Sequence, residues 1–184
     1  MSLSLSALRT ANLARQAEWD KAAGIDVVYR ANELAGEVGE ACNVIKKLSR
    51  ERLGIRGARA TVEDLASELA DVVICVDLVA MSLDLDFRGA TLGEGPFKVV
   101  LGSAAAPPLT SAGLQLTRGC GLVSSWVIWG ASSVQIGAAL DGLLQDCALV
   151  AAIEDIDLGA AVVAKFNATS EKVGLATRMI GGEA

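Results

Sequence analysis

Two stretches of the chain place acidic side chains along one face of an amphipathic helix. In the first, ANELAGEVGEACN from Ala31 to Asn43, acids recur at i, i+4 and i+7 as Glu33, Glu37 and Glu40. In the second, SELADVVICVD from Ser67 to Asp77, Glu68 and Asp71 are three residues apart. Like charges at these spacings destabilise an isolated helix by roughly 0.2–0.5 kcal/mol per pair. We therefore expect helices that bring the acids to a shared counter-charge.

A divalent cation is the simplest such counter-charge. If the two helices face each other, four carboxylates form a cage that suits a hard ion such as Mg²⁺: Glu37, Glu40, Glu68 and Asp71. For any single one of these acids a solvated helix face is the alternative. The apolar neighbours of the set, Val38, Ala41, Leu69 and Val72, favour the metal cage. Glu33 is expected outside the cage as a supporting or surface acid, and Asp64 as a helix cap. Asp77, on a different face from Asp71, is expected to be a structural or a polar-interface residue.

Composition favours an all-α fold in one domain. A chain of 184 residues is long enough to bury a core as a single domain. Aromatic residues make up only 4% of it, so Ala, Leu and Val must do the packing, which suits helices that lie close together. The net charge is −6 and no block of Lys or Arg exceeds a pair, which argues against nucleic-acid binding. There is no histidine, which excludes Ser-His-Asp and Cys-His catalysis and histidine-containing zinc sites.

Cysteine usage and the N-terminal sequence favour a cytoplasmic protein. Four cysteines lie far apart in apolar settings without a CxxC pair, which is typical of buried, reduced thiols: Cys42, Cys75, Cys120 and Cys147. Met1 to Ala14 lacks the basic start, apolar run and cleavage site of a signal peptide.

Four helices are expected to form the bundle around the cage. Their predicted ranges are Ala7 to Ala23, capped by Ser6 and stopped by Gly24; Asp26 to Leu48 or slightly beyond; Thr61, in a capping box with Asp64, to about Leu83; and Leu158 to about Lys172. The last residues, from Gly181, are expected to be loose.

Residues 87–157 have the character of an insertion between the third and fourth of these helices. The segment carries nine of the 38 charged side chains in its 71 residues, and similar tetrapeptides bracket it, LDLD from Leu83 and EDID from Glu154. Phe97 to Leu101 and Leu122 to Trp129 have strand-like content, and Val134 to Ile153 has helical spacing. Gly119 to Leu140 is uncharged over 22 residues, long enough to span a bilayer. Gly, Ser and Gln dilute that run, so a buried or partner-facing element is favoured over a membrane helix.

The motifs GEVGE (Gly36 to Glu40) and ELADV (Glu68 to Val72) resemble those of the MazG-type nucleoside triphosphate pyrophosphohydrolases. The N-terminal RQAEW, Arg15 to Trp19, and AVVAKFNATSEKVGL, Ala161 to Leu175, are similar to the first and last helices of that family. Many members of the family have a Glu pair at the start of the first motif, whereas here Gly36 precedes Glu37; the branch that is similar to dCTP pyrophosphatases tolerates a Gly there. The resemblance covers residues 1–86 and 158–178, which is nearly the whole chain outside the insertion.

The resemblance implies a four-helix bundle, a homodimer or tetramer, and Mg²⁺-dependent hydrolysis of a nucleoside triphosphate to a monophosphate and pyrophosphate, with Mn²⁺ as an alternative ion. It implies metal ligands at Glu37, Glu40, Glu68 and Asp71, with Glu37 or Glu40 also taking the proton of the attacking water. Lys165 would meet a phosphate, Asn167 would hydrogen-bond the substrate, and Trp19 would stack on the base unless it is a core residue. Phosphoryl chemistry needs charge neutralisation and positioning more than covalent help.

Two alternatives concern the insertion. Its low charge and apolar runs could turn the scaffold into a catalytically silent binding or assembly module. It could also be a poorly ordered remnant. The sequence leaves open whether the last helix, which follows 71 inserted residues, still brings Lys165 to the carboxylates.

Overall fold

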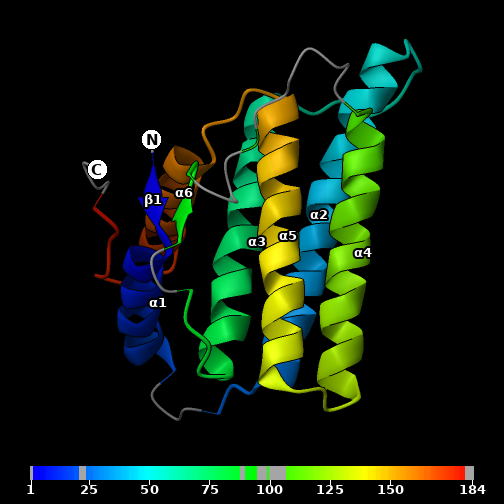
Figure 1. The fold of residues 1–184 in the computed structure, drawn as a ribbon. Helices are drawn as coiled ribbons and strands as arrows, with labels where there is room; N and C mark the ends of the chain where they lie inside the picture. The colour runs from blue at the N-terminus through cyan, green and yellow to red at the C-terminus, as the bar shows by residue number, and fades with distance from the viewer. Residues whose placement is uncertain (1, 21–23, 88–89, 95–98, 100–106, 181–184) are drawn as a thin grey trace.

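The chain folds into six helices and one two-stranded sheet in a computed structural model that describes residues 2–20, 24–87, 90–94, 99 and 107–180 (Figure 1). In chain order the elements are β1 (Leu3–Ser4), α1 (Leu5–Trp19), α2 (Val27–Arg52), α3 (Val62–Ser82), β2 (Thr91–Leu92), α4 (Leu109–Ile128), α5 (Ser133–Ile153) and α6 (Leu158–Lys172). β1 pairs antiparallel with β2 and places Leu3 opposite Leu92, both buried. The expected all-α fold is confirmed.

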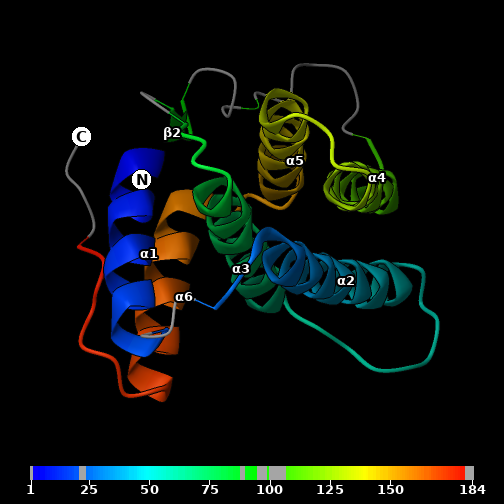
Figure 2. The ribbon, with the colours of Figure 1, turned by 90° about the horizontal axis from the view of Figure 1, so that it is seen from below.

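Helix α3 is the centre of the molecule. It packs against α2 and α5 on one side, and α1 and α6 lie on its other side, as Figures 1 and 2 show. Every residue from Val72 to Ala80 is buried, because neighbours cover α3 on more than one face. Helix α4 completes a group of four long helices by packing on both α2 and α5.

Local capping explains where most of the helices begin. Asp26 caps α2 by accepting a hydrogen bond from the Tyr29 backbone N–H at 2.8 Å. The predicted capping box of Thr61 and Asp64 opens α3, and its two hydrogen bonds measure 3.1 and 2.8 Å. Asp157 caps α6 through the Ala160 N–H at 3.0 Å. The predictions for the second, third and last of the four bundle helices are therefore confirmed to within a few residues.

The boundaries of the first helix differ from the prediction. It begins at Leu5, so Ser6 lies inside the helix rather than at its cap, and Ser4 at the N-cap makes no side-chain hydrogen bond. It ends at Trp19 rather than near Ala23, and the Asp20 N–H closes the last turn on the Gln16 carbonyl at 2.9 Å. Burial explains why the helix begins at Leu5, since Leu5 and Leu8 both pack in the core.

The inserted segment forms a helical hairpin, and the expected strand at Leu122 to Trp129 is wrong. That stretch is the last part of α4 and the first residue after it. Its Val, Ile and Trp content suits a strand, but the buried positions of α4 recur every three or four residues: Leu109, Ala112, Gly113, Leu116, Gly119, Cys120 and Val123. Packing of this face against α2 and α5 stabilises the helical conformation. The other expected strand, Phe97 to Leu101, lies outside the described residues except for Val99, which is in neither helix nor strand.

The helix expected from Val134 to Ile153 is confirmed as α5. The uncharged run from Gly119 to Leu140 is not one element, because the turn between α4 and α5 interrupts it. Within the described residues one helix, α5, is long and apolar enough to cross a membrane by length and composition, and 56% of its apolar window is buried inside the protein. This burial is what a core helix of a bundle shows.

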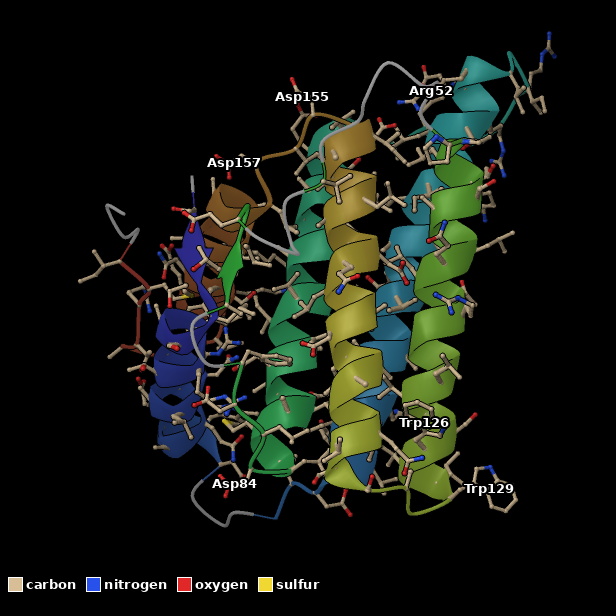
Figure 3. All side chains as sticks on the ribbon, viewed as in Figure 1. Arg52, Asp84, Trp126, Trp129, Asp155 and Asp157 are labelled. Atoms are coloured by element: carbon tan, nitrogen blue, oxygen red, sulfur yellow. The ribbon has the colours of Figure 1, made fainter. Side chains whose placement is uncertain are left out.

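The two tetrapeptides that bracket the insertion close α3 and α5 in the same way. Asp84 and Asp155 both have φ of +54°, a left-handed conformation that Asp tolerates at helix ends. The next residue then donates its N–H back into the helix, Leu85 to the Ala80 carbonyl at 2.9 Å and Ile156 to the Ala151 carbonyl at 2.8 Å. Asp84 and Asp155 lie at opposite ends of the bundle (Figure 3).

Candidate functional site

Three of the four predicted metal ligands come together between α2 and α3. Each of Glu37, Glu40 and Glu68 offers a carboxylate oxygen, and these atoms all lie within 4.8 Å of one another. Glu37 and Glu68 are half-buried and Glu40 is exposed. Two oxygens on opposite sides of a Mg²⁺ ion are about 4.2 Å apart, since each Mg–O bond is about 2.1 Å. Small side-chain movements would therefore close the three carboxylates on one ion.

The fourth predicted ligand, Asp71, is held by Lys165. The Lys165 Nζ lies 2.7 Å from Asp71 Oδ2 and also donates a hydrogen bond to Ser67 Oγ at 2.8 Å. Both side chains are largely shielded from water, with 26% of Lys165 and 19% of Asp71 exposed. Helix α6 thus brings Lys165 to the carboxylates in spite of the 71 residues that precede it.

The carboxylates are only partly neutralised by the cations around them. Burial and the neighbouring Asp71, Glu40 and Glu68 raise the pKa of Glu37 to about 7. Burial also raises the pKa of Glu68 and of Asp71, although Lys165 acts in the opposite direction on both. For Lys165, burial alone would lower the pKa, but the hydrogen bond and charge of Asp71 outweigh it and raise the pKa. The site favours additional positive charge, as a metal centre does.

A cavity of about 340 Å³ adjoins the carboxylates. Glu37 and Asp71 form part of its wall, and Trp19 lines it from the end of α1. Apolar residues from α3 and from the segment after α6 complete the wall: Ile74, Leu78, Val173 and Leu175. Its size is that of a small-ligand site. Trp19 is 47% exposed, so it is a rim residue rather than a core residue.

Two buried arginines beside this cavity were not anticipated as site residues. Arg15 stacks on the Phe166 ring with its guanidinium carbon 3.8 Å from the ring centre, and burial lowers its pKa. Arg30 binds Glu33 at 2.6 Å and Gln16 at 2.8 Å, and its guanidinium lies 5.5 Å from the Trp19 ring. Both arginines line the cavity. The available signal was their position, since each continues the buried stripe of its helix: Arg15 follows Leu8 and Ala11, and Arg30 precedes Leu34.

The remaining predicted residues take structural positions. Asn167 is not among the residues that line the cavity; its side chain donates to the Met179 carbonyl at 2.9 Å and accepts from the Met179 N–H at 2.7 Å. It therefore ties the segment after α6 to the helix. Asp77, buried to 1% exposure, accepts hydrogen bonds from Arg9 at 2.9 Å and Asn12 at 2.8 Å, as expected of a structural acid. Glu33 pairs with Arg30 at the edge of the site.

The four cysteines are free thiols. Cys75, Cys120 and Cys147 are buried as expected, whereas Cys42 is only half-buried. Burial raises the pKa of Cys75 and Cys147 well above the usual thiol range. Such thiols are inert structural side chains.

No protein-family model, curated protein or solved structure matches this chain. The residues and their geometry are therefore the basis for inferring what the protein does.

Proposed function

We propose that the protein is a Mg²⁺-dependent hydrolase of nucleoside triphosphates, with deoxynucleotides as the preferred class, that releases a monophosphate and pyrophosphate. The role would be cytoplasmic cleaning of the nucleotide pool, in the manner of the MazG-type enzymes that the motifs resemble. One observation carries the proposal: three clustered carboxylates and a lysine–aspartate pair adjoin a cavity of about 340 Å³, and Glu37 and Asp71 from these two groups line its wall. Carboxylates, a lysine and an adjoining cavity are what phosphate recognition through a metal requires.

The donor set fits a hard divalent cation, Mg²⁺ or Mn²⁺. Glu37, Glu40 and Glu68 supply oxygen ligands only, and Asp71, whose charge acts on Glu37, would join them if Lys165 released it. A bound ion of this kind would neutralise phosphate charge and acidify a coordinated water. The raised pKa of Glu37 supports the same interpretation, because it reflects burial first and then neighbouring like charges that Lys165 does not fully offset.

The protein's own residues would position the substrate and move the proton. Lys165, as a point charge at the edge of the carboxylates, would contact a phosphate oxygen. Trp19 at the cavity rim would stack on the base, with the apolar walls from α3 and the segment after α6 against the sugar. Glu37 is the stronger candidate for accepting the water's proton, because it is half-buried and lines the cavity; Glu40, which is exposed, is the alternative. Asn167 has no role in this proposal, because its side chain is already hydrogen-bonded to the Met179 backbone.

The test is a panel of ribo- and deoxynucleoside triphosphates incubated with purified protein and Mg²⁺. We expect pyrophosphate and the matching monophosphate from at least one of them. Glu40→Gln should reduce turnover by at least about 100-fold without unfolding the chain, since it removes one charge from the metal cage. Glu51→Gln is the matched control, an exposed acid on the same helix beyond the cluster. A folded protein that releases no pyrophosphate from any substrate would rule the proposal out.

A second candidate, a binding or assembly module, is favoured by one feature of the inserted hairpin. Three large apolar side chains at the α4–α5 turn are almost fully exposed: Ile128 at 73%, Trp129 at 83% and Val134 at 77%. Trp126 and Trp129 mark this end of the molecule in Figure 3. Self-association through this turn would account for them and for the expected dimer or tetramer. Light scattering distinguishes the cases: Trp129→Ser should convert an oligomer to a monomer, and an unchanged mass would remove the turn from the interface.

A further inference from the structure

A second cavity lies at the other side of α2, away from the carboxylates, and its lining is of a different kind. Its volume is about 390 Å³, and it is formed where the end of α2, the α2–α3 loop and the first half of α4 meet. The floor and rim are aliphatic: Ile45, Leu53, Ile55 and Leu114. In contrast to the carboxylate site, no acidic residue is among those that line it.

Helices α2 and α4 lie close together at one wall of this cavity. Gly113 of α4 lies directly over Ile45 of α2, and a β-carbon at Gly113 would sit 3.3 Å from Ile45 Cδ1. Leu53, Ile55 and Leu114 around the opening are 72%, 54% and 71% exposed. Exposure of three large apolar side chains around one cavity is unfavourable in a monomer. An apolar ligand in the cavity would shield these side chains from water.

Charge identifies the kind of ligand. Lys46 and Arg50 both line the cavity, one turn apart on α2. They belong to a basic stretch, residues 46–59, that holds six Lys and Arg and a single acid, Glu51, in a chain of net charge −6. Arg52 forms an ion pair with Glu154, and Arg59 forms one with Glu51. Within the described part of the chain, neither Lys46 nor Arg50 forms an ion pair.

We propose that this cavity binds a single-chain aliphatic anion, of the class of medium-chain fatty carboxylates. The carboxylate would lie between the Lys46 ammonium and the Arg50 guanidinium. The hydrocarbon chain would lie along Ile45, Leu53, Ile55 and Leu114. The lining contains no aromatic ring, which favours an aliphatic chain over a base or an aromatic acid. The inference stands apart from the proposed hydrolase activity, because the two cavities share no residue.

The experiment is a titration of the full-length protein with octanoate, decanoate and dodecanoate below their micelle-forming concentrations, followed by calorimetry. We expect saturable one-to-one binding that tightens about two- to fourfold with each added methylene. Dodecanol, which has the chain without the charge, and acetate, which has the charge without the chain, should bind at least about tenfold more weakly than dodecanoate. Equal binding of dodecanol and dodecanoate would overturn the proposal.

Variants test the location of the site. Lys46→Met should weaken dodecanoate binding by about tenfold, and Leu114→Gln should weaken it by a similar factor, each without loss of helicity because both side chains are exposed. Lys47→Met is the matched control, since Lys47 is adjacent in sequence but does not line the cavity. Unchanged affinity in Lys46→Met, or binding to phosphatidylglycerol vesicles with none to free dodecanoate, would overturn the proposal.

Discussion

Lys165 is the residue on which the proposed site depends most, because it occupies the carboxylate that a metal ion would need. Its ion pair with Asp71, at 2.7 Å, competes with metal binding in the absence of substrate. Lys165→Met should therefore bind Mn²⁺ roughly two- to fivefold more tightly, the equivalent of losing an ion pair worth up to about 1 kcal/mol. The same variant should lose at least about 100-fold in turnover, since the phosphate contact is gone.

Opposite effects on metal affinity and turnover distinguish this role from simple unfolding, which would lower both. Mn²⁺ binding is measured by electron paramagnetic resonance of the free ion, and turnover by pyrophosphate release. Lys172→Met, an exposed lysine in the last turn of the same helix, is the control and should change neither. Weaker Mn²⁺ binding in Lys165→Met would contradict the competition.

Glu37 makes the stability of the metal-free protein depend on pH. Its pKa is about 7 in the folded protein, against an ordinary value of 4.5. Below pH 4.5 the carboxyl is protonated in both states and contributes nothing to the pH dependence. Between pH 4.5 and 7 the unfolded chain releases this proton while the folded chain keeps it, so the free energy of unfolding falls as pH rises. Above pH 7 the loss is complete.

We therefore expect the melting temperature in EDTA to fall between pH 5 and pH 7.5, and to fall less in Glu37→Gln. Saturating Mg²⁺ should reverse the trend, because the ion binds the deprotonated carboxylates. The stabilisation by Mg²⁺ should accordingly be larger at pH 8 than at pH 5.5. Thermal melts monitored by circular dichroism measure all of these values, and a Glu37→Gln melting profile parallel to that of the parent would exclude Glu37 as the source.

At the scale of the element, α4 and α2 approach each other closely at a glycine. A side chain at Gly113 would press on Ile45, whose Cδ1 and Cγ2 lie 3.3 and 3.4 Å from the position of a β-carbon. Gly113→Leu should destabilise the protein by about 1–3 kcal/mol through overpacking.

Gly121, on the exposed face of the same helix, is the matched control. Nothing lies within 4 Å of the position of its β-carbon, so Gly121→Ala should stabilise the protein by about 0.5–1 kcal/mol. Urea unfolding measures both changes. Equal effects of the two substitutions would mean that α4 does not pack on α2 at Gly113.

The elements differ in how well sequence predicts them, for reasons that lie in their residues. Helices α2 and α3 were predictable because Asp26 and Thr61 cap them locally and their buried positions follow a helical period. The end of α4 was not, since Val123, Trp126 and Val127 suit a strand equally well and only packing decides. The acid cluster followed from the spacing of Glu37, Glu40 and Glu68. The burial of Arg15 and Arg30 depends on partners from other helices, which no local pattern reveals.

At the scale of the whole molecule, the inserted hairpin cannot be removed by joining its ends. Leu85 packs at the start of α5, 3.5 Å from the β-carbon position at Gly137, whereas Leu158 follows by two residues Ile156, whose N–H bonds the Ala151 carbonyl near the end of α5. These points are 14 residues apart on the helix, or about 21 Å. Direct fusion of Asp86 to Leu158 leaves Leu85 and Leu158 at most about 7 Å apart. Such a deletion would displace α6 and Lys165.

Cleavage of the hairpin tests how firmly it is held. A protease site placed at Gly130 in the α4–α5 turn breaks the chain at an exposed loop without removing any buried side chain. We expect the two fragments to co-elute and to keep their helicity, because α4 packs on α2 and α5 packs on α3. The uncut protein is the control. Separation of the fragments on a sizing column would show that the hairpin is an appendage.

The matched ends of α3 and α5 have a consequence for the ancestry of such a chain. Each tetrapeptide stops its helix with an Asp in a left-handed conformation and with backbone hydrogen bonds that its own residues donate, so neither stop depends on the sequence that follows. A segment that enters after one such stop and ends with another leaves the flanking helices with intact local signals. Residues 87–157 thus follow one such stop and end with the other, and genetic exchange at this junction would preserve helix endings while it changes what packs between them.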